Sequence, residues 1–294
     1  MGEFGIIIQV LISGILFGTM YGVAAIGLSL IFGTMRIIFF AQGTMIIFFA
    51  YICYWLFTLI GIDPYLSLIL LIPISLLLGM GFYYGLFKEA AALEQKEVSL
   101  LIAIGLMWAV ENIMTRVWTA DPRAIVTAYT SWILRPFGIN IPFTRLIALL
   151  IAVLSAIGVS LFLKRTRIGT AVRAASEDME STTLMGINPH WVNAVTFAIG
   201  IGLAGIAGVG LATVYSFDPM YGFTFVIMSV IALALGGMGN VFGALLGGII
   251  LGLIYNLTAY FIDSTWANAI CFVVFLLVLM FRPQGLFGGA AQKV

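Results

Sequence analysis

The chain has 294 residues, of which 63% are hydrophobic and only 9% are charged, far below the roughly 25% charged residues of soluble domains. With a mean hydropathy of +1.18, this composition excludes an ordinary soluble protein, and the formal net charge of +1 argues against nucleic acid as a partner. Apolar runs of about 20 residues recur, and each is long enough to cross a bilayer as a helix. The sequence therefore predicts an all-α polytopic membrane protein rather than a barrel, whose strands would alternate polar and apolar residues.

The apolar runs predict a bundle of about eight to nine transmembrane helices, all in one domain that covers residues 1–294. In chain order they lie near 5–32, 44–61, 65–87, 98–118, 144–163, 191–214, 222–238, 240–261 and 266–281. The count depends on Gly236–Asn240, where the glycines either separate two helices or break one long helix.

Loop charges predict the orientation, because Lys and Arg are enriched in cytoplasmic loops. If 164–190 is cytoplasmic, strict alternation also places Arg36 and 88–97 inside. The outer turns then hold acidic residues at Asp63, Asp218 and Asp263.

The C-terminal tail bears on the number of spans. Nine spans bring Arg282 and Lys293 to the cytoplasmic side, whereas eight would leave them outside, so the charges favour nine spans and an outer N-terminus. The long loop 119–143 is the exception, because it carries Arg123 and Arg135 on the outer side.

Small residues recur every four positions on three of the predicted helices. The series are Gly14, Gly18 and Gly22; Gly200, Ala204, Gly208 and Ala212; and Gly239, Gly243 and Gly247. Such series let helix backbones approach closely in a membrane, where no hydrophobic effect drives helices together. They predict a compact bundle.

The segment 164–190 is one long polar stretch between membrane-length apolar runs. Its charged residues are Lys164, Arg165, Arg167, Arg173, Glu177, Asp178 and Glu180. The residues over 167–185 and a stop at Gly186 predict one short helix, with Ile168, Val172 and Ala175 as an apolar stripe. We expect this segment to contact a partner in the cytoplasm; the alternative is a solvated surface loop.

Glu111 is the most conspicuous ionisable residue inside a predicted span, about 20 Å along the helix from Val98. A carboxylate at that depth is expected to face the bundle interior, where buried acids are candidates for transport. The alternative role is structural, through an inter-helix hydrogen bond made with Asn112. Arg116, five residues later, either pairs with Glu111 or reaches the outer interface.

The sequence contains no catalytic or metal-binding motif. The single His190 has no second ligand nearby in sequence, and Cys53 and Cys271 lie inside apolar runs. Neither a Gly-x-Ser-x-Gly elbow nor a phosphate-binding loop ending in Gly-Lys-Ser/Thr is present. We therefore expect a non-enzyme without a cofactor, and any ATP that drives it is expected to be bound by a separate chain.

Four motifs follow one another along the chain. They are Gly27–Arg36 followed by Ala41-Gln42-Gly43; Ile104-Gly105-Leu106 with Glu111-Asn112 and Arg116; Leu235–Asn240 with Gly243-Ala244; and Arg282–Gly288. In this order and at these spacings the chain resembles, nearly end to end, the permease subunits of the high-affinity branched-chain amino acid family of bacterial ABC importers.

The resemblance implies two groups of site residues. The first group resembles the family's ATPase-coupling loop, whose helix would sit in a groove of a nucleotide-binding subunit. Its residues are Arg167, Gly169, Arg173, Ala174, Ala175, Glu177, Asp178 and Gly186. Candidates for the pathway or its framework are Gln42, Gly43, Glu111, Asn112, Arg116, Gly236, Gly237, Gly239 and Asn240. One departure is Phe39, where the family usually has Asn, and it puts the cargo or the pathway in question.

The resemblance also implies the function and the partners. The chain would be a non-catalytic permease subunit of the bacterial inner membrane that moves branched-chain or other hydrophobic amino acids, the alternative cargoes being amides or urea. The implied partners are a second, similar permease subunit, two cytoplasmic ATPase subunits that bind the ATP, and a periplasmic or lipid-anchored binding protein, in addition to membrane lipid.

Two other classes of protein remain as alternatives. An ion-coupled secondary transporter needs intramembrane carboxylates or polar clusters at helix breaks, often within an inverted repeat, and only Glu111 qualifies. A membrane-embedded enzyme would need paired acids or histidines, which the sequence lacks.

Overall fold

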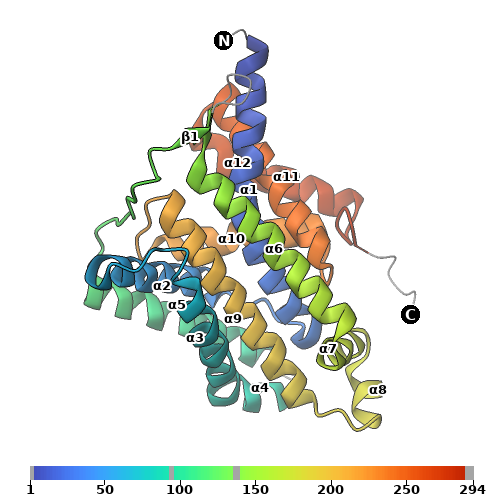
Figure 1. Cartoon of the computed structure of the whole chain (residues 1–294). Helices are drawn as coiled ribbons and strands as arrows, with labels where there is room; N and C mark the ends of the chain where they lie inside the picture. Colours follow the sequence, from blue (N-terminus) through green and yellow to red (C-terminus); the bar gives the residue numbers. More distant parts are fainter. Residues whose placement is uncertain (1–2, 93–95, 135–139, 289–294) are drawn as a thin grey trace.

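The computed structural model describes residues 3–92, 96–134 and 140–288. It is built almost entirely of helices, as predicted (Figure 1). In chain order these are α1 Glu3–Met35, α2 Ala41–Trp55, the π-helical η1 Leu56–Ile60, α3 Leu68–Phe82, the π-helical η2 Tyr83–Phe87, α4 Lys88–Ala92, α5 Lys96–Trp118, α6 Phe143–Arg165, α7 Arg167–Glu177, α8 Met179–Leu184, α9 Pro189–Val214, α10 Tyr221–Gly236, α11 Val241–Phe261 and α12 Ser264–Phe281. Two short strands, β1 Ile133–Leu134 and β2 Ile141–Pro142, form an antiparallel pair.

Eight of the described helices are long and apolar enough to cross a membrane. The remaining predicted segment, 222–238, is α10, an apolar helix of 16 residues, which spans only about 24 Å at 1.5 Å per residue. The glycines at 236–240 separate α10 from α11, so the alternative of one long broken helix is wrong. Gly237 and Gly239 adopt φ angles of 96° and 85°, a left-handed region that ends α10 and is open to glycine at little cost.

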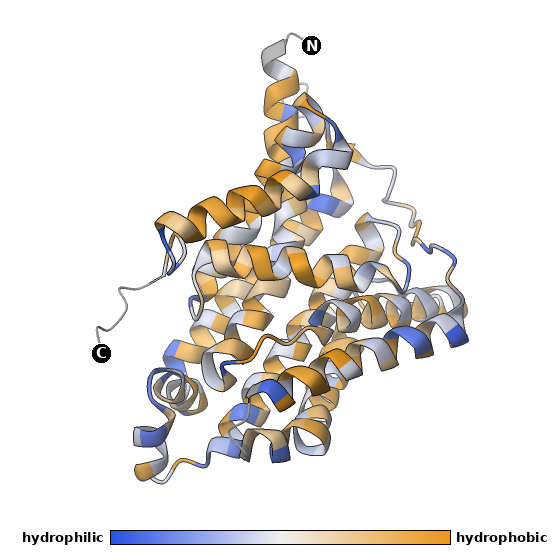
Figure 2. Ribbon diagram, turned by 180° about the vertical axis from the view of Figure 1, so that it is seen from behind, coloured by the Kyte–Doolittle hydropathy of each residue, from blue (hydrophilic) through white to orange (hydrophobic). Residues whose placement is uncertain are grey.

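The centre of the bundle is formed by α1 and α9, and the outer positions by α3, α5, α6 and α12. Apolar residues run along all the long helices (Figure 2), and many large apolar side chains are exposed while others are buried between the helices. This distribution suits a protein surrounded by acyl chains, because a surface in lipid needs no polar side chains.

Helices α1 and α11 make the most extensive helix pair, in which the predicted series on α1 packs against Leu245, Gly248 and Gly252 of α11. The predicted series Gly239, Gly243 and Gly247 is wrong as one face of a helix, because Gly239 precedes α11, and Gly243 and Gly247 pack against α10 instead of α1. A Cβ on Gly18 would overlap the carbonyl oxygen of Gly248 and lie 2.8 Å from the Cα of Ile249. Only glycine allows the two backbones to approach this closely, so the small residues specify which faces of α1 and α11 meet.

The two ends of the bundle differ in content (Figure 1). The N-terminus and β1 lie at one end, and α4, α7 and α8 lie at the other, so the segments that were both predicted to be cytoplasmic share an end. Two of the basic residues used in the orientation argument, Arg135 and Lys293, lie outside the described residues.

The polar segment forms two helices, α7 and α8, and the prediction of one helix over 167–185 is wrong. Asp178 breaks the helix: its backbone is extended, and its carboxylate accepts hydrogen bonds from the backbone N–H groups of Glu180 and Ser181 at 3.0 and 3.2 Å. An aspartate at this position caps the next helix instead of continuing the previous one. Gly186, with a φ of 85°, follows the end of α8 as expected.

Candidate functional site

Helix α7 is seated on the ends of the membrane helices. Thr166 caps it by accepting a hydrogen bond from the backbone N–H of Gly169, at 2.9 Å. A Cβ on Gly169 would overlap the carbonyl oxygen of Phe162 in α6, so the glycine brings the first turn of α7 into contact with α6. The side chains of Val172 and Ala175 are buried.

Helix α7 also contacts α1 and α9. At its C-terminal end, Ser176 lies opposite Gly33 of α1, 3.6 Å from the position of a Cβ on that glycine. The segment is therefore in contact with the two central helices of the bundle and with α6, and a displacement of α7 would act on all three.

The predicted coupling residues divide by exposure. Arg167, Arg173, Glu177, Asp178 and Gly186 are exposed, Ala174 is half-buried, and Gly169 and Ala175 are buried. The predicted apolar stripe is wrong at one position, because Ile168 is exposed.

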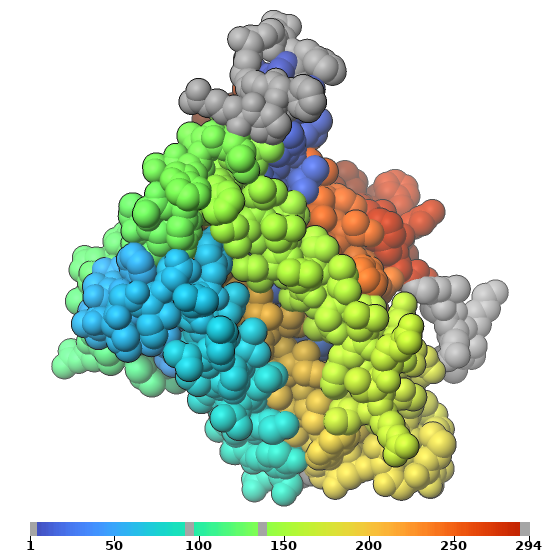
Figure 3. Space-filling view, in the orientation of Figure 1, coloured from blue at the N-terminus to red at the C-terminus, as the bar shows by residue number. Residues whose placement is uncertain are grey.

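The surface of α7 and α8 adds two apolar residues that the sequence analysis missed. Leu184 is 84% exposed and Met185 is 69% exposed at the end of the α7–α8 segment. Figure 3 shows this segment at the lower right of the molecule. The sequence did contain a signal for them, because two large apolar residues stand directly before the glycine that ends the polar segment. The exposed surface of this segment therefore combines charges with two adjacent apolar side chains.

The carboxylate of Asp178 lies on this same surface. Hydrogen bonds from the side chain and the backbone of Ser181, and from the backbone of Glu180, hold its pKa below the usual value for aspartate. Asp178 is therefore ionised at neutral pH. Its negative charge next to the N-terminus of α8 stabilises that helix.

The glycine break between α10 and α11 is joined to the C-terminal motif, although the two are far apart in sequence. The Nδ2 of Asn240 donates to the carbonyl oxygen of Phe287 at 3.0 Å, while its Oδ1 caps α11 by accepting from the N–H of Gly243 at 3.0 Å. The N–H of Leu286 donates to the carbonyl oxygen of Leu235 at 2.8 Å. We call residues 282–288, held in this way on 235–240, the C-terminal clasp.

Gln42 connects α2 to the centre of the bundle. Its side chain is fully buried, its Nε2 donates to the carbonyl oxygen of Gly200 in α9 at 3.0 Å, and its Oε1 has no partner among the described residues. Next to it, Gly43 lies so close to α10 that a Cβ there would overlap the carbonyl oxygen of Gly222. Buried polar atoms without partners are uncommon, so Gln42 is a candidate for contact with water or cargo.

Phe39, the departure from the family pattern, lies in a packed aromatic group. Its ring is fully buried, and its centroid lies 5.8 Å from that of Phe87 and 4.8 Å from that of Phe197. These edge-to-face contacts join the turn before α2 to η2 and α9.

Glu111 is buried on α5, as expected for an intramembrane acid, whereas Asn112 and Arg116 are exposed. The side chain of Asn112 donates to the carbonyl oxygen of Trp108 in its own helix, at 2.7 Å, and not to a neighbouring helix. The three residues therefore do not lie on one face of α5.

Six aromatic residues from α1, α10, α11 and the end of α9 form a group that the sequence analysis missed. They are Phe17, Tyr21, Tyr215, Tyr221, Phe225 and Tyr255, and we call them the outer aromatic cluster. The ring of Phe17 has its centroid 5.2 Å from that of Tyr21 and 4.7 Å from that of Tyr255. Because the rings come from four separate parts of the chain, no local pattern signals them.

Polar groups accompany these rings. The hydroxyls of Tyr21 and Tyr221 are 3.5 Å apart, and the buried hydroxyl of Tyr215 has no partner among the residues that the structure describes. The guanidinium of Arg145, near the start of α6, lies 5.6 Å from the centroid of the Tyr215 ring. Aromatic faces, phenol hydroxyls and a cation are thus combined in one place.

Comparisons with known proteins agree with the motif pattern. The family model described as branched-chain amino acid transport system / permease component matches residues 10–279. The high-affinity branched-chain amino acid transport system permease protein BraD of Pseudomonas aeruginosa is 30% identical over 96% of this chain and 95% of its own. The corresponding permease protein LivH of Escherichia coli is 26% identical, over 97% of both chains.

A second permease protein of the Escherichia coli system, LivM, is 31% identical over 49% of this chain and 34% of its own length. No solved structure gives a significant match. The family model covers nearly the whole described bundle, from α1 to α12. The chain belongs to the branched-chain amino acid transport system permease family.

Proposed function

We propose that this chain, a multi-pass inner-membrane permease, moves branched-chain and other hydrophobic amino acids across the membrane as one subunit of an ABC importer. The observation that carries the proposal is the similarity over nearly the full length to BraD and LivH, both named as high-affinity branched-chain amino acid permeases. The amide and urea alternatives find no support among these relatives.

The energy is supplied by two separate ATPase subunits that dock on α7 and α8. Three features support this docking: the charges of the exposed face, the exposed Leu184 and Met185, and the seating of α7 on α1, α6 and α9. Closure of the ATPases on ATP would displace α7 and shift the bundle between its two open states. The chain itself needs no cofactor and performs no catalysis.

A second permease subunit completes the membrane part. The partial similarity to LivM, which is itself named as a permease protein of such a system, supports a homologous partner rather than an unrelated one. A periplasmic or lipid-anchored binding protein delivers the amino acid to the outer side.

The outer aromatic cluster is our candidate for the first contact of the amino acid with this chain. Its rings offer an apolar surface to a branched side chain, and Arg145 offers a cation to the carboxylate. Helix α9 begins beside α8 and ends at Val214 next to the cluster, so the cluster lies away from the ATPase-docking end (Figure 1).

Reconstitution tests the proposal. The chain, its partner permease, the ATPases and the binding protein are placed in proteoliposomes, and uptake of labelled leucine is measured with the proton gradient collapsed. We expect uptake that requires ATP and is competed by isoleucine and valine but not by urea or acetamide. Uptake that ignores ATP and stops when the gradient is collapsed would instead identify an ion-coupled carrier.

A further inference from the structure

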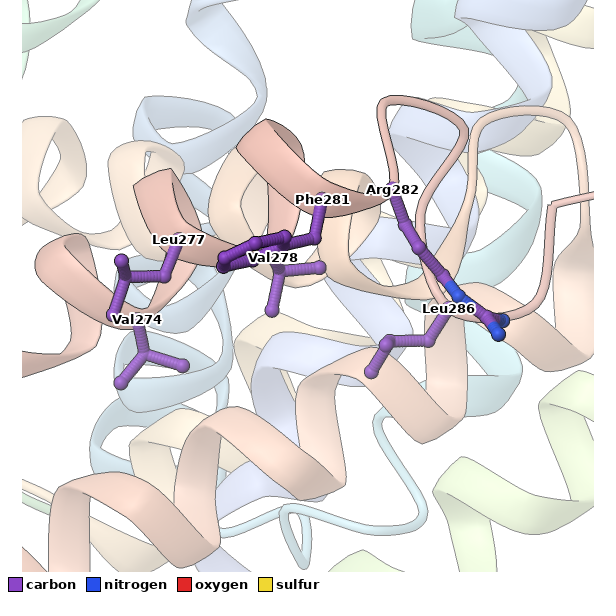
Figure 4. Close-up of a pocket in the computed structure, with 6 residues that line it drawn as sticks. All are labelled: Val274, Leu277, Val278, Phe281, Arg282 and Leu286. Carbon is purple, nitrogen blue, oxygen red and sulfur yellow. The ribbon is translucent and has the colours of Figure 1, made fainter.

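A pocket lies at the C-terminal end of α12, on the edge of the bundle. Its volume is about 260 Å³, and it is lined by Val274, Leu277, Val278, Phe281, Arg282 and Leu286 (Figure 4). The lining is almost wholly apolar, and Arg282 is its one charged residue. Phe281 is 76% exposed, so the pocket opens to the surroundings of the bundle rather than to its interior.

The position of the pocket determines what surrounds it. Helix α12 is among the least buried helices, and its outward side chains are large and apolar, including Leu276, Leu277 and Met280. A helix of this composition and length faces acyl chains. The pocket lies where α12 ends at Phe281 and the chain turns at Pro283, so it lies at the boundary between acyl chains and head groups, on the cytoplasmic side in the predicted topology.

The charge at the pocket is a single arginine. Arg282 is exposed, and within residues 3–92, 96–134 and 140–288 no carboxylate forms an ion pair with it. Figure 4 shows its side chain extending from the end of α12 alongside Leu286. A guanidinium offers a planar fork of N–H donors that fits the two oxygens of a phosphate.

These features together select an amphiphile with an anionic head. A water-soluble anion would gain nothing from the five apolar residues, and an apolar partner helix would leave the guanidinium without a counter-charge. We infer that the pocket is a binding site for an anionic phospholipid, with one acyl chain along Val274, Leu277 and Phe281 and the phosphate on Arg282. Basic sites at the cytoplasmic ends of membrane helices are where such head groups bind.

The site is connected to the C-terminal clasp. Leu286 forms part of the pocket wall, and its backbone N–H is bonded to the carbonyl oxygen of Leu235 at the end of α10. A lipid against Leu286 therefore stabilises the clasp on the glycine break, by binding the native arrangement in preference to an open one.

The experiment is lipid titration of the full-length protein, purified from native membranes and observed by native mass spectrometry. Phosphatidylglycerol and phosphatidylcholine with identical acyl chains are compared. We expect the wild type to bind phosphatidylglycerol about tenfold more tightly, the range of a hydrogen-bonded charge pair, and Arg282→Gln to remove this preference. Arg116→Gln, which removes another exposed arginine of a membrane helix, is the matched control and is expected to retain it.

Leu277→Trp separates the acyl-chain contribution from the charge. The larger side chain fills the pocket, and we expect it to weaken the binding of both lipids while the protein stays folded, because the side chain of Leu277 is half exposed. Inorganic phosphate at matched concentration is expected not to displace the lipid.

Three results would overturn the inference. They are unchanged phosphatidylglycerol selectivity in Arg282→Gln, full displacement of the lipid by inorganic phosphate, and a protein–protein complex that is dissociated by Leu277→Trp, which would mean that another subunit covers the pocket. None of these measurements depends on what the permease transports.

Discussion

At the residue scale, a few polar side chains fix local geometry in a chain that has few of them. Asp178 is one, because a single carboxylate ends α7 and begins α8. Its cap turns the charged segment so that Leu184 and Met185 lie exposed at the tip. In a soluble protein such a cap is one among many, but here it determines the shape of the polar segment 164–190.

Replacing Asp178 with Ala is expected to fray α8 and to weaken association with the ATPases several-fold, because a helix loses its N-cap. Copurification of the ATPases with the permease measures the effect. Asp263→Ala is the matched control. Asp263 caps α12 in the same way, because its carboxylate accepts a hydrogen bond from the N–H of Thr265 at 2.7 Å, but it lies at the start of α12 and not in the α7–α8 segment. Equal losses in the two variants would contradict a docking role for α8.

Acid is expected to act on the same cap. The pKa of Asp178 is lowered in the folded protein, so its contribution to stability is present above the ordinary aspartate pKa and is lost as the pH falls through the lower, folded pKa. Proteolysis of the segment should therefore accelerate only in strong acid. Asp178→Asn, whose amide oxygen also caps, should show no such acid dependence at this position.

Arg145 is the residue through which the outer aromatic cluster can be tested. Arg145→Gln is expected to raise the KM for amino acid uptake about tenfold, because the carboxylate loses a charged hydrogen-bond partner, and to leave membrane insertion unchanged. Arg123→Gln is the matched control, since Arg123 lies 5.8 Å above the Tyr54 ring but outside the cluster. A normal KM in Arg145→Gln would place the first contact elsewhere.

At the scale of elements, glycines decide how helices meet and end. The α1–α11 pair depends on close backbone approach, and the break between α10 and α11 depends on positive φ angles and on the C-terminal clasp. Two glycines of the break, Gly237 and Gly239, differ in their surroundings. A Cβ on Gly237 would lie 2.5 Å from the backbone nitrogen of Gly288 in the clasp, whereas nothing lies within 4 Å of a Cβ on Gly239.

This difference predicts unequal effects of substitution. Gly237→Val should lower the melting temperature in detergent strongly, because it combines backbone strain of about 1–3 kcal/mol with a clash against the backbone of Gly288. Gly239→Ala meets only the strain and should cost less. Gly81→Val, on a glycine with open space and ordinary helical φ, should change the melting temperature little. Equal effects at 237 and 239 would show that the clasp contributes nothing.

At the scale of the whole molecule, the polar segment of α7 and α8, on which we propose that the ATPases dock, lies at one end of the bundle, and the outer aromatic cluster lies toward the other. Between them lie α1 and α9, which contact both the α7 segment and the residues of the cluster. This arrangement suits a permease that takes its energy from other chains, because a displacement at the polar end can reach the cluster along two rigid helices.

Glu111 separates this mode of energy supply from ion coupling. In an ATP-driven importer Glu111 need not carry a proton, so Glu111→Gln, which keeps the shape and much of the hydrogen-bonding capacity, should retain ATP-dependent uptake. Glu111→Leu should lose more, because it removes that capacity from a buried position. Uptake is measured in reconstituted vesicles with the proton gradient collapsed. If Glu111→Gln is inactive and wild-type uptake stops with the gradient, the chain is an ion-coupled carrier.

The sequence by itself determined the class of fold, the positions of the membrane helices, the helix stop at Gly186 and the family motifs. These properties depend on local composition: apolar runs of membrane length are helices because lipid offers the backbone no other hydrogen-bond partner. The same locality explains the error at Asp178, where a residue acceptable within a helix instead formed a cap with the two residues that follow it.

Only the tertiary structure brought residues 282–288 onto the glycine break, gathered six aromatic residues from four parts of the chain, and placed Phe39 in a packed aromatic group. In soluble helices the apolar stripe tells which face is buried, but these helices carry large apolar residues on exposed as well as buried faces. Hydropathy therefore locates each helix without indicating its neighbours. Those are selected by close backbone contacts, such as Gly18 against Gly248, and by hydrogen bonds between distant residues, such as Asn240 with Phe287.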